Sequence, residues 1–488
     1  MFGNYEKGLY NQFAEVMARL ESVEKLYKKN VKTLNDRIDE LTEENKALRK
    51  ENKLLKDENA RLKSIINNDS SSTSLPPSTD QKGGKSANAF NGRSKTGRKA
   101  GGQKGHPGTT LTKSDIIKKI ESGKYKHKIQ TIGVVSDSNY ITKYVVDLSV
   151  EPIITEIRIY ADEKGNFSIP TQYRSDVTYG ENVKALAVSL YSEGVMSNDR
   201  IASFLNSAGG GELCLSEGSV YSFCRKFEEI SKNSIEHLNE TLSIKNIVAT
   251  DATTVTVNGK QNYIRNFSTV DTVVYNAMKS KSIKSLKDID FLNKYAGTLI
   301  HDHETALYHF GTDHAECNVH IILYLRKNSE EAQNKWSEDM IKLLSNMNKD
   351  RKELISKGSS SMPAECIKEY EEKYFSILKQ GDKENKGTTH KYAKMEEAAL
   401  IRRMRKYSHN HLLFLHDFSI PFNNNISERD LRKAKNRQKM AGGFRKEGGH
   451  KMYCSIMTIV ETLKKRNMGL IENIRKLFIG TPAIFYLV

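Results

Sequence analysis

The chain has 488 residues, 37% of them hydrophobic, which is enough for two or three domains. Its 77 Lys and Arg residues against 60 Asp and Glu residues give a formal net charge of +17, which favours a polyanionic partner, with nucleic acid as the obvious one. Apolar runs fall short of the roughly 20 residues of a spanning helix, and the first residues lack an apolar signal region, so no membrane partner and a cytoplasmic location are expected. The five scattered cysteines argue against a disulfide framework.

A seven-residue repeat predicts a coiled coil over residues 12–67. One core position is always leucine, at Leu34, Leu41, Leu48, Leu55 and Leu62. The other is apolar at its ends and asparagine at its three middle positions, in the order Val31, Ile38, Asn45, Asn52, Asn59 and Ile66. Asparagine at a core position costs stability but pairs best with its counterpart in a parallel two-stranded coil. We therefore expect a parallel homodimer or a higher oligomer, with a single solvated helix as the alternative.

Residues 68–111 predict a basic flexible linker. Ser and Pro come first, and the segment between Lys82 and Lys104 then carries seven basic residues and no acidic ones, interleaved with Gly and Ser. Such an arm suits contact with phosphates, although a solvated tail has the same composition. The candidate DNA-binding residues are Arg93, Lys95, Arg98, Lys99 and Lys104.

Two modules are expected next. Residues 112–178 contain alternating apolar stretches, such as YVVDLSV and ITEIRIY, and predict a small β-rich module. Residues 179–242 predict helices, two of them joined by a Gly-containing turn that resembles a helix-turn-helix. A plain packing hairpin is the alternative. If the pair reads DNA, the second helix presents Ser219, Tyr221, Ser222 and Arg225.

Two acids then lie on expected strands. Lys245–Val257 predicts a strand with Asp251 in its middle, and a second β-rich stretch, Tyr263–Met278, follows at hairpin distance. A helical segment leads to a short apolar strand that ends at Asp302. The order predicts an open α/β layer, which is compatible with a ribonuclease H-like fold but does not single it out.

A third acid, Glu428, opens a long basic helix. Three carboxylates from separated segments could hold two Mg²⁺ ions about 3.5 to 4 Å apart. Arg429, Arg432 and Lys435 follow Glu428, and the last two share its face, where they would hold a phosphodiester.

Other readings of the same acids stay open. Asn425-Ile-Ser-Glu428 also fits a capping box, in which Glu428 only satisfies a backbone N–H at the helix start. Asp251 and Asp302 could be ordinary strand-end acids, and Glu304 or Asp313 could replace Asp302 as a ligand.

A histidine and cysteine cluster offers a zinc alternative. His314, Cys317 and His320 have a ligand-like spacing, and a fourth ligand would come from His301, His303 or His309. The same spacing also fits one face of a helix packed beside the acids, which we favour.

Four motifs in the same order resemble the transposases of the insertion sequence 66 family, over most of the chain. NDSSSTSLPPSTD and GRKAGGQKGHPGTTL are similar to the family's Asn-Ser-Ser-x-Pro-Pro-Ser and Gly-Gly-Gln-x-Gly-His-x-Gly signature. ATDATT resembles the family segment that carries the first catalytic Asp. HDHETALYHFG with HAECNVH resembles the segment that carries the second catalytic Asp and a Cys-x-x-His pair. NNNISERDLRKAKNRQKMAGG resembles the segment that carries the catalytic Glu.

The resemblance implies a DDE-type transposase with a multidomain α+β fold. Its ribonuclease H-like catalytic domain would span residues 243–320 and 418–468, with a helical insertion at 321–417 and a C-terminal tail at 469–488. Asp251, Asp302 and Glu428 would hold two Mg²⁺ ions, with Mn²⁺ as a substitute. The implied partners are transposon-end DNA, target DNA and accessory proteins of the same element.

Two departures from the family pattern matter. Relatives commonly carry a Cys-x-x-Cys zinc finger after the Gly-Gly-Gln motif, but this chain has no cysteine before Cys214. Asp302-His303-Glu304 stands where Asp-Gly-Tyr is more usual, which keeps the ligand and changes its neighbours. A non-catalytic DNA-binding or regulatory protein derived from a transposase is the main alternative, and an RNA-directed nuclease is a third.

The heptad pattern makes a direct prediction. Deletion of residues 1–66 should convert a dimer into a monomer in sedimentation-equilibrium measurements, because the Leu positions supply the dimer interface. An unchanged mass would contradict this assignment.

Overall fold

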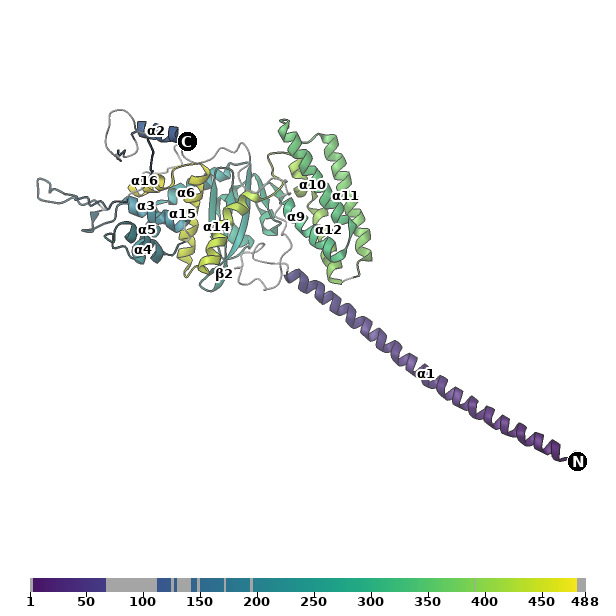
Figure 1. The fold of residues 1–488 in the computed structure, drawn as a ribbon. Helices are drawn as coiled ribbons and strands as arrows, with labels where there is room; N and C mark the ends of the chain where they lie inside the picture. The colour runs from purple at the N-terminus through teal and green to yellow at the C-terminus, as the bar shows by residue number, and fades with distance from the viewer. Residues whose placement is uncertain are drawn as a thin grey trace.

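The computed structural model describes residues 3–66, 112–123, 127–129, 142–146, 150–170, 173–193, 196–389 and 391–480. The basic arm lies outside these ranges, so Arg93, Lys95, Arg98, Lys99 and Lys104 remain sequence predictions. The described chain is mixed α+β, with one five-stranded sheet among many helices (Figure 1).

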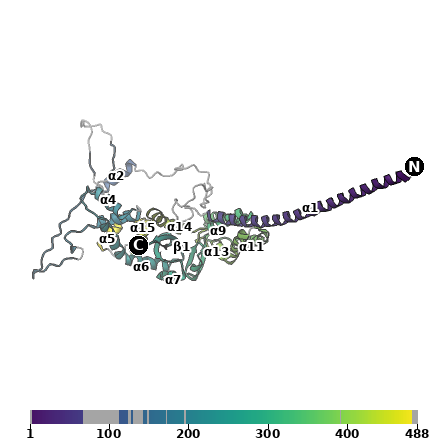
Figure 2. The ribbon, with the colours of Figure 1, turned by 90° about the horizontal axis from the view of Figure 1, so that it is seen from below.

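The predicted N-terminal helix is present. Helix α1 (Gly3–Ile66) is continuous over 64 residues and extends away from the folded body in both views (Figures 1 and 2). Its heptad side chains are exposed, for example Leu34 at 62% and Leu48 at 50%. An apolar stripe of this length needs a partner helix, so the coiled coil stays a prediction about an assembly of several chains.

The β-rich module expected over 112–178 is not found in the described residues of that range. They contain helix α2 (Lys113–Glu121) and one isolated bridge between Ala161 and Phe167. The alternating stretch around Ile154 has no strand partner, and its apolar side chains are exposed, Ile154 at 98%. Alternation favours a strand only where one face can be covered, and nothing in the described chain covers this one.

Four helices form the expected helical region. They are α3 (Glu181–Glu193), α4 (Asn198–Ala208), α5 (Glu217–Ile230) and α6 (Lys232–Ser243). The Ser197 side chain caps α4, and Ser216 forms a capping box at the start of α5. A turn that begins with three glycines, Gly209 to Gly211, joins these two helices, as the sequence predicted.

The sheet has the strand order β3-β2-β1-β4-β5. Strands β1, β2 and β3 form an antiparallel meander, and β4 and β5 lie parallel to β1 on its other side. The bounds are Ile247–Val257, Lys260–Ser268, Val273–Met278, Thr298–His301 and Asp313–Glu316. The predicted β-rich stretch after β1 is therefore two strands, and β5 was not predicted.

Short helices connect the strands, and longer ones cover both faces of the sheet. Between strands lie α7 (Ile283–Lys287), α8 (Asp290–Lys294) and the 3-10 helix η3 (Thr305–His309). Residues 321–417 are largely helical, in α9 (Asn318–Ala332), α10 (Lys335–Ser356), α11 (Ala364–Gly387), α12 (Lys391–Lys406) and α13 (Ser408–His416). The chain then forms α14 (Asn425–Ala441), α15 (Glu447–Lys465) and α16 (Leu470–Ile479).

Each face of the sheet contributes to a different core. Val248 and Leu299 pack with α3, α5 and α15, whereas their neighbours Ala249 and Ile300 pack with the helices of the insertion. Figure 1 shows these helix groups on opposite sides of the sheet. None of the helices in the described ranges is long and apolar enough to cross a membrane.

The C-terminal end of α14 is held against β1 by a close backbone approach. The Phe444 N–H donates to the Thr256 carbonyl at 2.7 Å, and the Asn258 N–H donates to the Phe444 carbonyl at 2.8 Å. Gly443, with φ 128°, allows this contact because a Cβ there would lie 2.3 Å from the Thr256 oxygen. These two hydrogen bonds and Gly443 form a clamp that fixes the C-terminal end of α14. Glu428 lies near the other end of the same helix.

A pair of adjacent glycines tests the clamp. Gly443→Ala should destabilise the protein by about 3 kcal/mol, because both the backbone conformation and the Thr256 carbonyl oppose a side chain. Gly442→Ala should cost only about 1 kcal/mol, since a Cβ at Gly442 meets nothing within 4 Å and only its φ of 69° is unfavourable. Denaturant unfolding measures both values, and equal losses would contradict the contact.

Candidate active site

The parallel register of β1 and β4 brings Asp251 and Asp302 together. Ala249 pairs with Ile300 across the two strands, and each acid lies two residues further along its strand direction. Because side chains alternate along a strand, both acids belong to the sheet face of Ala249 and Ile300. Asp251 accepts the Ala252 N–H at 2.6 Å.

Glu428 joins them because a polar network fixes the start of α14 on the sheet. Asn266, opposite Asp251 on β2, accepts the Asp251 N–H at 3.1 Å and the Ser427 hydroxyl at 2.6 Å, and donates to the Ser427 carbonyl at 2.9 Å. Asn424 donates to the Thr250 carbonyl at 2.9 Å. Asn266, Asn424 and Ser427 are all buried, so these bonds are shielded from water.

The capping-box interpretation of Glu428 is wrong. Helix α14 begins at Asn425 with Asn424 as the N-cap residue, so Glu428 is the fourth helical residue rather than the third after the cap. No side-chain capping bond forms at this helix start. The Glu428 carboxylate instead lies 3.8 Å from the ring of His320.

His320 lies between two of the acids. Its Nδ1 is 3.2 Å from Asp302 Oδ1, in addition to the contact with Glu428. Ligand atoms of Asp302, Cys317, His320 and Glu428 all lie within 4.8 Å of one another. Asp251 is not in this tight group but lines the same cavity as Asp302.

The acids perturb one another electrostatically. Burial raises the pKa of Asp251, and the neighbouring Asp302 raises it further. Burial and then Asp302 also raise the pKa of Glu428. For His320, burial opposes protonation, but the contacts with Asp302 and Cys317 outweigh it and raise the pKa to about 12. The site thus concentrates negative charge that a cation would neutralise.

The cavity beside Asp251 and Asp302 has a volume of about 210 Å³ and is lined by two cationic side chains, the buried Arg265 and the partly exposed Lys281. Arg265 is fully buried, donates to Thr250 Oγ1 at 3.1 Å and forms an ion pair with Glu304. Lys281 lies 3.4 Å from the other Glu304 oxygen. Because Glu304 is neutralised by two cations, it is a poorer metal ligand than Asp302.

The other residues considered as ligands, Asp313 and His314, also have partners of their own. Asp313 contacts His409 at 3.1 Å, so it has its own partner. His314 lies on β5 and contacts His301 at 3.2 Å, outside the group of ligand atoms around Asp302. The helix-face interpretation of the His314-Cys317-His320 spacing is wrong, because His314 lies on β5, which ends at Glu316, and α9 begins only at Asn318, after its N-cap residue Cys317.

The basic residues predicted to follow Glu428 lie on α14, of which Glu428 is the fourth residue. Arg429 and Arg432 are exposed, and Lys435 is half-buried and lowers the pKa of both Asp251 and Glu428, so it lies close to them. Arg225 lies on α5 and forms an ion pair with Glu228.

Sequence reasoning missed Asn266, although a signal was present. Asn258-Gly259 forms the two-residue turn between β1 and β2, with φ values of 49° and 71°. This dipeptide is the strongest short hairpin signal, and a two-residue turn fixes which residues face each other. Counting back from it pairs Asp251 with Asn266.

His303, next to Asp302, has a φ of 56°. This left-handed conformation costs a residue with a side chain about 1–2 kcal/mol. His303 must therefore gain from its contacts, of which the bond of Nδ1 to Glu316 at 2.8 Å is the closest.

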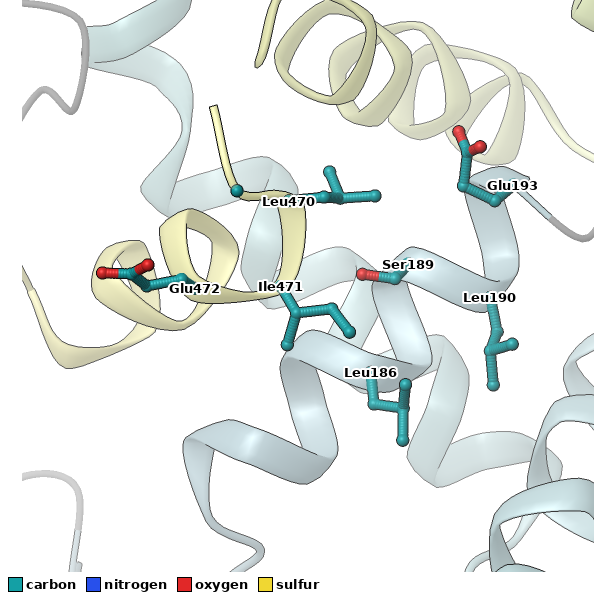
Figure 3. A pocket seen from close by; sticks show the side chains of 8 residues that line it. Leu186, Ser189, Leu190, Glu193, Leu470, Ile471 and Glu472 are labelled. Atoms are coloured by element: carbon teal, nitrogen blue, oxygen red, sulfur yellow. The ribbon is translucent and has the colours of Figure 1, made fainter. Parts of the chain in front are cut away.

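A second cavity, of about 520 Å³, lies between α3 and α16 (Figure 3). Leu186, Leu190, Leu470 and Ile471 give it an apolar lining, with Glu193 and Glu472 beside it. It contains no constellation of ligands comparable to that around Asp302.

One family model matches the chain. It is described as "Transposase IS66 family" and covers residues 177–452, from the start of the helical region into α15. All three acids and the helical insertion lie inside the match, whereas α1 and the basic arm lie outside it. No curated protein matches the chain.

The raised pKa of Asp251 makes a stability prediction. A carboxyl whose pKa is raised on folding destabilises the folded state once it ionises, so Asp251→Asn should stabilise the metal-free protein by roughly 1 kcal/mol at neutral pH. The gain should vanish at pH values below the ordinary Asp range, where the carboxyl is protonated in both states. Thermal unfolding against pH measures it. Asp288→Asn, which removes an exposed acid, is the control, and an equal gain in that variant would contradict the assignment.

Proposed function

The chain belongs to the IS66 transposase family, and on that premise we propose that it nicks and joins DNA strands at a metal centre formed by Asp251, Asp302 and Glu428. The observation that carries the proposal is the convergence of three acids from β1, the end of β4 and the start of α14. Family membership implies a DNA substrate, and the acids supply the chemistry that a DDE mechanism requires.

The sheet supports a ribonuclease H-like assignment for the catalytic domain. Its order β3-β2-β1-β4-β5, with three antiparallel and two added parallel strands, is compatible with that fold. The carboxylates also lie where ligands gather in open α/β sheets, at the ends of adjacent parallel strands.

The donor atoms fit divalent cations. Asp302 Oδ1 is buried and faces His320 Nδ1 at 3.2 Å without a well-directed hydrogen bond, so a bound cation would stabilise this oxygen further. Carboxylate oxygens suit Mg²⁺ or Mn²⁺, while Cys317 and His320 would favour a softer ion. When bound, two Mg²⁺ ions would activate a water or 3′-hydroxyl and stabilise the leaving oxygen.

The protein groups around the acids have separate roles in this proposal. Asn266 and Ser427 hold Asp251 and the start of α14 at a fixed distance. His320 holds Asp302 and Glu428 near each other by contacting both. Arg432 and Lys435 neutralise the phosphodiester on the α14 side.

DNA is bound over a wider surface than the metal centre. The basic arm with Arg93 to Lys104 and Arg225 on α5 would contact end or target DNA, and α1 would join two chains so that both ends of the element are held together.

Removal of either of two acids tests the proposal. Asp251→Asn and Glu428→Gln should lower Mg²⁺-dependent cleavage of a labelled duplex bearing the element's ends by roughly 10³-fold or more, because the acids act as a unit. Binding of the same duplex in Ca²⁺ should be retained. Glu447→Gln, at an exposed acid of α15, should cleave normally.

The opposite outcome supports a different class of protein. If the unaltered protein binds the duplex but neither nicks nor joins it in Mg²⁺ or Mn²⁺, the chain is a non-catalytic DNA-binding or regulatory protein.

A further inference from the structure

A fully buried acid, Glu316, lies at the end of β5, where it pairs with His301 of β4 in the sheet. Its Oε1 is 2.8 Å from His303 Nδ1 and accepts the Tyr308 hydroxyl. Its Oε2 accepts an Arg403 N–H at 2.6 Å and lies 3.3 Å from His411 Nε2. Both carboxylate oxygens are thus occupied by protein groups, and Glu316 has no part in the group of ligand atoms around Asp302.

Glu316 remains ionised in spite of its burial. Burial alone would raise its pKa, but the hydrogen bonds from His303 and His411 and the charge of Arg403 hold the pKa well below the usual range. A buried charge with this many partners is a rigid anchor, because the loss of any one of them leaves an uncompensated group.

The anchor holds the residue next to the second catalytic acid. His303 follows Asp302 directly and has a left-handed backbone, with φ 56°. Its ring also contacts Tyr407 edge-on at 4.9 Å, and Tyr407 stacks on Tyr308 at 4.8 Å. The His303 side chain, bonded to Glu316, therefore fixes the backbone of the loop that follows β4 and contains Asp302, which we call the Asp302 loop.

The other partners of Glu316 come from the helical insertion. Arg403 lies on α12 and His411 on α13, and Tyr407 lies between these two helices. Glu316 therefore connects the Asp302 loop to a part of the chain more than 80 residues away in sequence, as the Arg403 separation of 87 shows.

We propose that His303 is a positioning residue, which orients Asp302 for metal binding and connects that orientation to the packing of the helical insertion through Glu316 and Arg403. The inference rests on the proposed metal centre. A metal ligand held by a second layer of hydrogen bonds typically loses 10–100-fold in metal affinity when that layer is broken.

Substitution at His303 separates positioning from folding. Glycine adopts a positive φ without strain, so His303→Gly should keep the fold and lose only the link to Glu316. Asparagine tolerates the same backbone and places a side-chain amide N–H near the position of Nδ1, so His303→Asn should restore the link.

The measurement is Mn²⁺ binding to the full-length protein by isothermal titration calorimetry, without DNA. His303→Gly should weaken Mn²⁺ binding roughly tenfold, and His303→Asn should recover most of that loss. Arg403→Lys, which cannot reproduce the guanidinium geometry, should weaken binding in the same direction. Asn467→Gly is the matched control, because Asn467 also has a positive φ, 53°, and is exposed.

Each contrary result has a distinct meaning. Unchanged Mn²⁺ binding in His303→Gly, with an unchanged unfolding temperature, overturns the positioning role. Unchanged binding in Arg403→Lys overturns the connection to the insertion. If the unaltered protein binds no Mn²⁺, or Asp302→Asn binds it equally well, the proposed metal centre itself fails and the inference falls with it.

Discussion

The rest of the site depends on one constraint, the repulsion between the carboxylates of Asp251 and Asp302. The parallel register of β1 and β4 brings these two side chains together. Asp251 and Asp302 lie on neighbouring strands and on one face, and burial strengthens the interaction of their charges. Strand pairing fixes their approach, so the acids cannot relax by moving apart. Neighbouring cationic groups, His320 and Lys435 among them, offset part of this charge, and a divalent ion would offset more.

The surrounding structure holds the mutually repelling acids in place from two sides. On one side, Asn266 and the start of α14 form a buried hydrogen-bond network that sets Glu428 against the strands. On the other side, Glu316 connects the Asp302 loop with the helical insertion. The insertion is therefore part of the support of the site as well as a separate helical core, since Ile300 and Ala315 of the sheet pack into that core.

Much of this could be predicted from local pattern, and the rest depends on partners distant in sequence. The strand around Asp251 followed from its β-branched composition, the strand that leads to Asp302 from a short apolar run, and the helix of Glu428 from a long basic segment. The stretch around Ile154 forms no strand in the described residues, because alternation does not reveal whether a covering partner exists. The roles of His303 and Glu316 depend on a φ value and on side chains from α12 and α13, which no local pattern contains.

Crystals of the protein soaked in Mn²⁺ and measured at the manganese absorption edge test the central claim most directly. We expect anomalous density bound by carboxylate oxygens of Asp251, Asp302 and Glu428 together, with the His303 ring still bonded to Glu316. Density held by Cys317 and His320 without Asp251, or no density near Asp302, would contradict a single metal centre built from the three acids.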